Sequence, residues 1–167
     1  MGQTAEQMEI IPPQVDLRRK VRVLPTKAGV DDAVARAEAA IKKLSTSFNV
    51  WIEDEIDQID SAWETLQSAG LDDDEACQTF YRRAHDLRGL ALTLGFPLAG
   101  QVAASLCLLF EELPSPTMIP ELLVRQHVEA IRAIVRENAR EENDRIGAAL
   151  AEKLLEVTRE FIQAKKN

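Results

Sequence analysis

The chain has 167 residues, of which 46% are hydrophobic and 29% charged, a length and composition that predict one domain with a core large enough to be stable without disulfide bonds. Its two cysteines, Cys77 and Cys107, form no CxxC pair, which excludes a disulfide-built secreted scaffold and favours a reducing, cytoplasmic compartment. A net charge of −8 and the lack of an apolar stretch of roughly 18 to 20 residues argue against nucleic-acid binding and against a membrane protein.

Residues 1–29 are predicted to form a flexible arm outside the folded domain. They contain three prolines and a run of basic residues, and they show no sustained hydrophobic period. Two interpretations stay open for this arm: a solvated tail that complements an acidic body, or a segment that docks on a partner or binds nucleic acid. The basic residues are Arg18, Arg19, Lys20, Arg22 and Lys27.

Two helices are predicted between Val30 and Gly70. Apolar residues recur there every three or four positions, which is the spacing of an amphipathic helix. The cluster at residues 45–47 consists of serine and threonine, which are good helix caps, and it predicts a break between the two helices. The apolar positions are Val34, Ala37, Ile41, Leu44 and Phe48, followed by Ile52, Ile56, Ile59, Trp63 and Leu66.

Glycines and prolines delimit the next helices. The acidic cluster at 72–75 is a strong helix start because carboxylates satisfy free amides and the helix dipole, and this helix is expected to run to Leu94 and to end at Gly95. Pro97 opens a helix that continues to about Leu113. After the PSP sequence at 114–116, Pro120 opens the following helix.

Two apolar stripes complete the chain. The first predicts inward-facing residues at Leu123, Val128, Ile131 and Val135, and the second at Ile146, Leu150, Leu154, Val157 and Phe161. The two stripes are compatible with one long helix, and the second could pack on the bundle or pair two chains. No alternating strand pattern occurs, so the sequence predicts an all-α fold.

The segment 72–95 contains the best candidate for chemistry. Its core stripe includes Phe80, Ala84 and Leu87, and about 100° of rotation per residue places His85 at roughly 140° from the centre of that stripe, facing away from the core. Gly89, one turn later, removes a side chain beside the imidazole, and an exposed neutral imidazole is a competent nucleophile.

Other interpretations of these residues remain open at this point. His85 could be an incidental surface histidine, or it could join His127, Cys77 and Cys107 in a metal site, although no ExxH or HxxxH pair exists. Both cysteines are expected to be small core residues. His127 is expected at the rim of the core, and Trp51 is expected to cover the first helix or to belong to a partner surface.

The sequence His85-Asp86-Leu87-Arg88-Gly89, followed by Gly95 ten residues after the histidine, resembles the HxLKG motif of histidine-containing phosphotransfer (HPt) domains. The resemblance implies an up-down four-helix bundle over about residues 46–138, with additional N-terminal and C-terminal helices, the latter at about 143–164. The folded part of the chain is expected to be one domain, residues 30–167. Leu87 and Gly95 match the structural positions of the motif.

The resemblance also implies a function. His85 would accept a phosphoryl group from an aspartyl phosphate on a receiver domain of a response regulator or hybrid histidine kinase, and would pass it to another receiver. Arg88 stands where the family has lysine and would stabilise the phosphoryl oxygens. Cys107 stands where the family often has a glutamine that orients the histidine. The residues expected to dock the receiver are Gly89, Tyr81, Leu92, Gln78 and Arg82.

The implied carrier is not an autonomous kinase. The chain has no P-loop and no GxGxxG pattern, so it is expected to bind no cofactor itself, and the Mg²⁺ would belong to the receiver. A monomer is expected. The alternative is a non-catalytic helical adaptor that binds a signalling partner through its outer helix face or its C-terminal helix.

Overall fold

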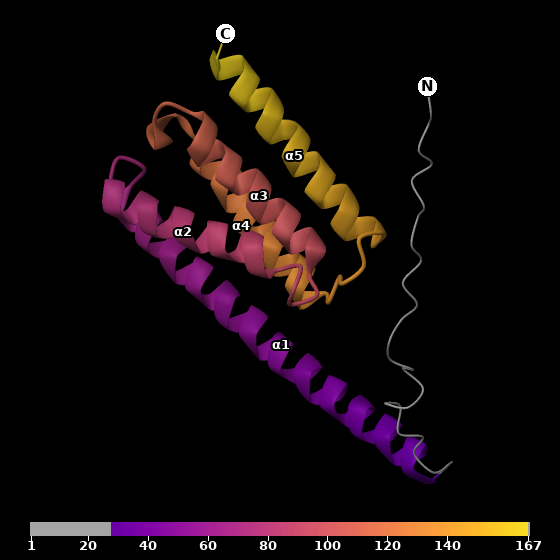
Figure 1. The fold of residues 1–167 in the computed structure, drawn as a ribbon. Coiled ribbons are helices and arrows are strands. Elements are labelled where there is room, and N and C mark those ends of the chain that lie inside the picture. Colours follow the sequence, from indigo (N-terminus) through magenta and orange to yellow (C-terminus); the bar gives the residue numbers. More distant parts are fainter. Residues whose placement is uncertain (1–27, 167) are drawn as a thin grey trace, which may run out of the picture. The chain divides into compact units, whose positions relative to one another are not determined.

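The computed structural model describes residues 28–166, and within them helices joined by turns and loops are the only regular secondary structure (Figure 1). This confirms the all-α fold class. Residues 1–27 of the predicted arm lie outside the described range, and residues 28 and 29 belong to the first helix. The elements are α1 (Ala28–Ala69), α2 (Asp74–Leu90), α3 (Pro97–Glu112), the 3₁₀ helix η2 (Pro116–Met118), α4 (Glu121–Arg136) and α5 (Arg145–Lys166).

The chain divides into two compact units, residues 1–41 and 42–167, with the boundary inside α1. The paragraphs that follow concern the second unit. Among the described helices, none combines the length and the apolar character that a bilayer span requires.

The predicted break at 45–47 is wrong, because α1 continues through it without interruption. The Thr46 hydroxyl donates a hydrogen bond to the Lys42 carbonyl at 3.1 Å, and the Ser47 hydroxyl donates to the Lys43 carbonyl at 3.2 Å. These bonds run backward to the preceding turn instead of capping a new helix, so the hydroxyls are accommodated inside a continuous helix.

The second half of α1 supplies one wall of the core. Ile52, Ile59 and Leu66 are each 1% exposed, and the ring centroids of Trp63 and of Phe80 in α2 are 5.6 Å apart. These residues belong to the stripe that the sequence predicts. The predicted stop is also confirmed: α1 ends at Ala69, and Gly70 follows with a φ of +96°, where a glycine is favoured.

The second helix begins as predicted and ends earlier than predicted. Asp73 caps α2 by accepting a hydrogen bond from the Ala76 amide at 2.8 Å. The α-helix ends at Leu90 instead of Leu94, and residues 91–95 form a turn. In this turn the Phe96 amide donates to the Ala91 carbonyl at 2.8 Å and the Gly95 amide donates to the Leu92 carbonyl at 3.1 Å. This pair of bonds replaces the regular helical pattern and requires the left-handed φ of Gly95, +86°.

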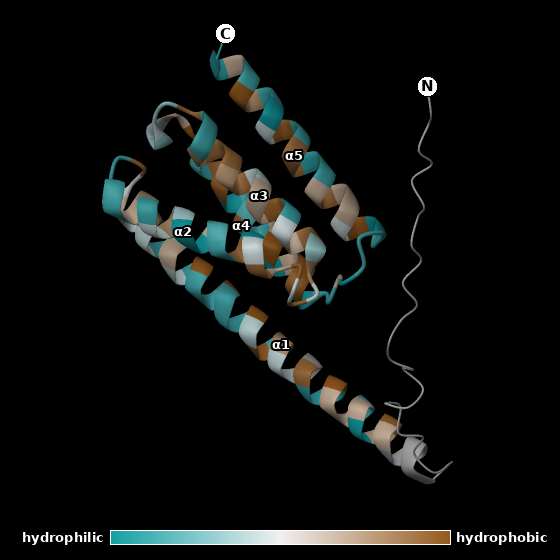
Figure 2. Cartoon of the chain, in the orientation of Figure 1, coloured by the Kyte–Doolittle hydropathy of each residue, from teal (hydrophilic) through white to brown (hydrophobic). Residues whose placement is uncertain are grey.

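The third helix is the central one, since it contacts α2, α4 and α5. It starts at Pro97 as predicted, and most of its residues are buried. Gly100 lets its backbone approach α2 closely, because a Cβ there would lie 3.3 Å from the Ala91 Cβ. Figure 2 shows the contrast with α5, along which hydrophilic and hydrophobic residues alternate.

The last two helices are separate. Asn138, with a φ of 55°, terminates the turn after α4, and α5 begins at Arg145 and packs on α3 and α4 of its own chain. The predicted inward face of α5 is rotated: Ile146 is 81% exposed. The buried residues of α5 are Gly147, Ala151, Leu154, Thr158 and Ile162.

Two contacts explain this rotation. A Cβ on Gly147 would lie only 2.8 Å from Leu98 Cδ1 of α3, so the start of α5 approaches α3 closely on its glycine side. Further along α5, Thr158 enters the core because its hydroxyl has hydrogen-bond partners there. Leu150, Val157 and Phe161 of the predicted stripe are half-buried beside this face.

Candidate functional site

The core-facing residues of α2 determine where His85 lies. Phe80, Ala84 and Leu87 are each 0% exposed, so this side of α2 is fixed against the core, and His85 is carried to the opposite side. Its side chain is 51% exposed. The outward orientation expected from the helical spacing is therefore confirmed.

Few groups surround the imidazole. Its Nδ1 lies 3.9 Å from Asp86 Oδ1, and its ring centroid lies 6.0 Å from that of Tyr81. Within the described residues, no hydrogen bond is formed to either ring nitrogen. Cys107, expected at the register of an orienting glutamine, is 0% exposed in the core, and burial raises the pKa of its thiol to about 11. The imidazole ring of His85 is thus accessible to a partner molecule.

A charged network lies beside His85. Glu111 on α3 accepts a hydrogen bond from the Tyr81 hydroxyl at 2.8 Å and one from Arg88 Nη1 at 3.0 Å, both on Oε1. Sequence analysis did not single out Glu111, because its proximity depends on how α3 is aligned with α2. Arg88 is therefore close to His85 along the helix but paired with a carboxylate.

An exposed stripe runs along α2 on both sides of His85. Positions 78, 82, 85 and 89 are three or four residues apart, which places them on one face of α2, and Leu92 follows in the turn after the helix. All five are exposed, and Leu92 is 68% exposed. Of the residues expected to dock a receiver, Tyr81 alone is half-buried, against the ring of Phe110.

Nothing in the described part of the chain requires a glycine at position 89. A Cβ built on it has no neighbouring atom within 4 Å, and its φ is not in the left-handed region. A glycine inside a helix costs about 1 kcal/mol relative to alanine. The open space beside His85 is thus available to another molecule.

A hollow of about 420 Å³ adjoins the site on its α3 side. Tyr81 and Glu111 belong both to its wall and to the network beside His85. The lining residues are Asp74, Cys77, Gln78, Tyr81, Phe110, Glu111 and Pro116.

His127 lies in the core, and its expected place at the rim is wrong. It is 0% exposed, its Nδ1 is 2.7 Å from the Leu123 carbonyl, and its Nε2 is 3.0 Å from Ser105 Oγ and 3.2 Å from Thr158 Oγ1. Every polar atom of this cluster has a partner. Since none of it reaches solvent, the Ser105–His127 pair is structural.

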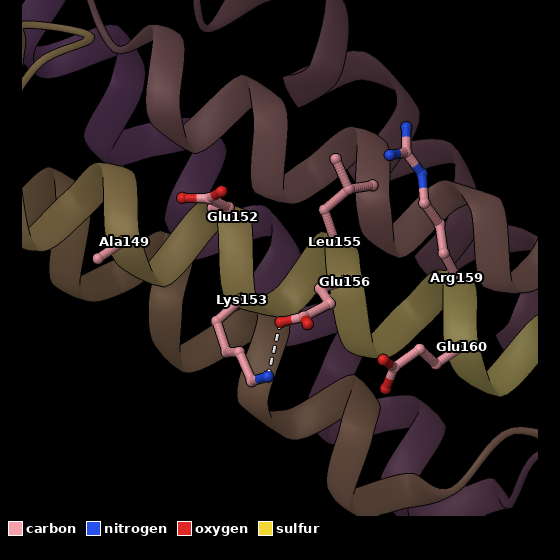
Figure 3. Close-up of a pocket in the computed structure, with 7 residues that line it drawn as sticks. All are labelled: Ala149, Glu152, Lys153, Leu155, Glu156, Arg159 and Glu160. Carbon is pink, nitrogen blue, oxygen red and sulfur yellow. Dashed lines mark hydrogen bonds and ion pairs between the residues drawn. The ribbon is translucent and has the colours of Figure 1, made fainter.

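Elsewhere in the described residues, no second candidate for a reactive or ligand-binding site is found. No group of three or more histidine, cysteine, aspartate or glutamate side chains there is arranged to hold a metal ion, and the two buried cysteines are free. A hollow of about 570 Å³ on α5 (Figure 3) is lined by that helix alone, with Lys153 paired to Glu156 at 2.6 Å. It is a solvated helix face.

Comparison of the chain with protein-family models, with curated proteins and with solved structures gives no significant match.

Proposed function

We propose that this chain is a histidine phosphotransfer protein of a multistep phosphorelay, with His85 as the phosphoacceptor. The observation that carries the proposal is the combination of an exposed imidazole with open space at Gly89 on the same helix face. The HPt-like motif around His85 supports the same assignment. In this proposal the helices form an HPt-like four-helix bundle with additional N-terminal and C-terminal helices.

The proposed reaction moves one phosphoryl group in line between two partners. The unprotonated ring nitrogen of His85 attacks phosphorus, the bond from phosphorus to the aspartyl oxygen of the receiver breaks, and the aspartate leaves as a carboxylate. The return step reverses these bonds on a second receiver.

The remaining parts of the reaction have defined sources in this proposal. Arg88, three residues after His85, supplies positive charge for the phosphoryl oxygens. The exposed stripe, residues 78, 82, 85 and 89 of α2 with residue 92 in the turn after it, receives the receiver domain. Mg²⁺ and the acidic pocket belong to the receiver, and the protein acts in the cytoplasm as a monomer.

The test is incubation of the purified protein with a panel of radiolabelled phospho-receivers. We expect label on the wild type that is stable in base and labile in acid, and no label on His85→Gln. His127→Gln is the matched control, because it removes the other histidine of the chain and should keep acceptance while it remains folded.

Two results would contradict the proposal: label that persists on His85→Gln, or no label on the folded wild type from any receiver. The second result would favour the adaptor function. Circular dichroism of each variant establishes that the helices are intact.

A further inference from the structure

One carboxylate oxygen on α3 connects the two residues that flank His85 on α2. Tyr81 lies four residues before His85 and Arg88 three residues after it, so each is one turn away along the helix. Both donate to Glu111 Oε1, at 2.8 Å and 3.0 Å. The network therefore runs past His85 on the side that faces α3.

In this arrangement the Glu111 carboxylate competes with a phosphoryl group for the guanidinium of Arg88. The side chains of Arg88 and Glu111 are 34% and 32% exposed, and ion pairs at such exposure are weak. Tyr81 holds the carboxylate in place, and the same hydrogen bond raises the pKa of the Tyr81 phenol. A phosphoryl group, which carries a charge of about −1.5 to −2, has enough charge to compete for the guanidinium.

We propose that Glu111 is a positioning residue that restrains Arg88 and so limits how strongly Arg88 stabilises a phosphoryl group on His85. This inference rests on the proposed function. A carrier must release its phosphoryl group as well as accept it, and an unrestrained arginine would make phosphohistidine more stable and slower to transfer.

The experiment uses chemical phosphorylation, which needs no receiver. Potassium phosphoramidate transfers its phosphoryl group to histidine: the phosphorus–nitrogen bond to ammonia breaks, ammonia leaves, and a bond to the ring nitrogen forms. His85 is exposed and His127 is buried, so the reagent should modify His85, with His85→Gln as the blank. The measured quantity is the pH midpoint at which the phosphoryl group titrates, followed by phosphorus NMR.

We expect Glu111→Gln to lower this midpoint by roughly 0.3 to 0.7 pH unit, because an Arg88 side chain released from Glu111 favours the dianionic form of the phosphoryl group. Arg88→Ala should raise it. In the Arg88→Ala background, Glu111→Gln should have little further effect, which separates restraint of Arg88 from the direct charge effect of Glu111.

Glu112→Gln is the matched control. Glu112 is the next residue of α3 and loses the same charge, but it pairs with Lys166 at 2.5 Å instead of with Arg88. Its midpoint should equal that of the wild type. A second readout is the ultraviolet titration of Tyr81, the single tyrosine of the chain, whose pKa should fall in Glu111→Gln and stay unchanged in Glu112→Gln.

The inference is overturned by an unchanged or raised midpoint in Glu111→Gln, by an equal shift in Glu112→Gln, or by an equal shift in the Arg88→Ala background. Failure of the reagent to modify His85 would overturn it as well. Since no receiver takes part, a negative receiver panel combined with the expected midpoints would reject the phosphorelay function while leaving the control of Arg88 by Glu111 in place.

Discussion

His127 Nε2 lies 3.2 Å from the Thr158 hydroxyl, so α4 and α5 are joined by a polar contact inside the core. Ser105 of α3 lies 3.0 Å from both groups and completes the cluster. Three helices thus share one set of buried hydrogen bonds, and a buried polar group that loses its partner costs about 1 to 3 kcal/mol.

Folding stability should decrease in mildly acidic solution because of His127. Burial lowers its pKa from the ordinary value of 6.5, so the unfolded chain binds a proton more readily than the folded one. The contribution is fully present above about pH 6.5 and is lost as the pH falls from there through the lowered folded value, by at most about 1.4 kcal/mol per pH unit. Urea unfolding at several pH values measures this slope, and His127→Gln should flatten it near pH 6. An equal slope in that variant would show that other groups cause the effect.

Thr158→Val should destabilise the protein by about 1 to 3 kcal/mol, although the two side chains have nearly the same shape. The reason is that the substitution removes the hydroxyl partner of His127 and Ser105 in the core. Thr65→Val is the control, because the Thr65 hydroxyl bonds to the Ser61 carbonyl on an exposed helix face. Denaturant midpoints compare the two, and equal losses would mean that the buried cluster contributes no stability of its own.

Gly89→Ala should stabilise the protein by about 0.5 to 1 kcal/mol, because the new methyl group enters open space and improves helix propensity. Gly89→Leu should also fold but should block phosphoryl transfer from a receiver. The control is Gly100→Ala, where the new Cβ would lie 3.3 Å from the Ala91 Cβ, so no gain is expected. Normal transfer in Gly89→Leu would contradict docking on this face.

His85→Gln should change the free energy of unfolding by less than about 0.5 kcal/mol, because the side chain is half exposed and its ring has no hydrogen-bond partner within the described residues. His127→Gln, by contrast, should be clearly destabilising. Thermal melts of the two variants provide the comparison. A large loss in His85→Gln would mean that the imidazole has a structural role.

Several helix boundaries could be predicted from the sequence because they depend on local chemistry, although α2 ends at Leu90 instead of Leu94. Gly70, Gly95 and Pro97 act through their own backbone geometry, which needs no tertiary partner. The predicted break at 45–47 failed for a related reason: a serine or threonine hydroxyl can cap a helix or bond back to the preceding turn, and sequence alone does not distinguish the two.

The remaining differences depend on contacts between helices. Hydropathy places Ile146 inward and Thr158 outward, whereas the core provides partners for the Thr158 hydroxyl and leaves Ile146 in solvent. His127 is buried for the same reason, because Ser105 and Thr158 provide hydrogen-bond partners for its ring in the core. Glu111 could not be found either, because its contact with Arg88 depends on the register between α2 and α3.

The central position of α3 has a consequence for how the bundle assembles. Its residues face α2, α4 and α5, and nine of them are buried, among them Val102, Leu106 and Leu109. Such a helix has too little polar surface to persist alone in water, and each neighbour lacks part of its apolar contact area until α3 is in place. The helices of residues 42–166 should therefore form in one cooperative folding transition.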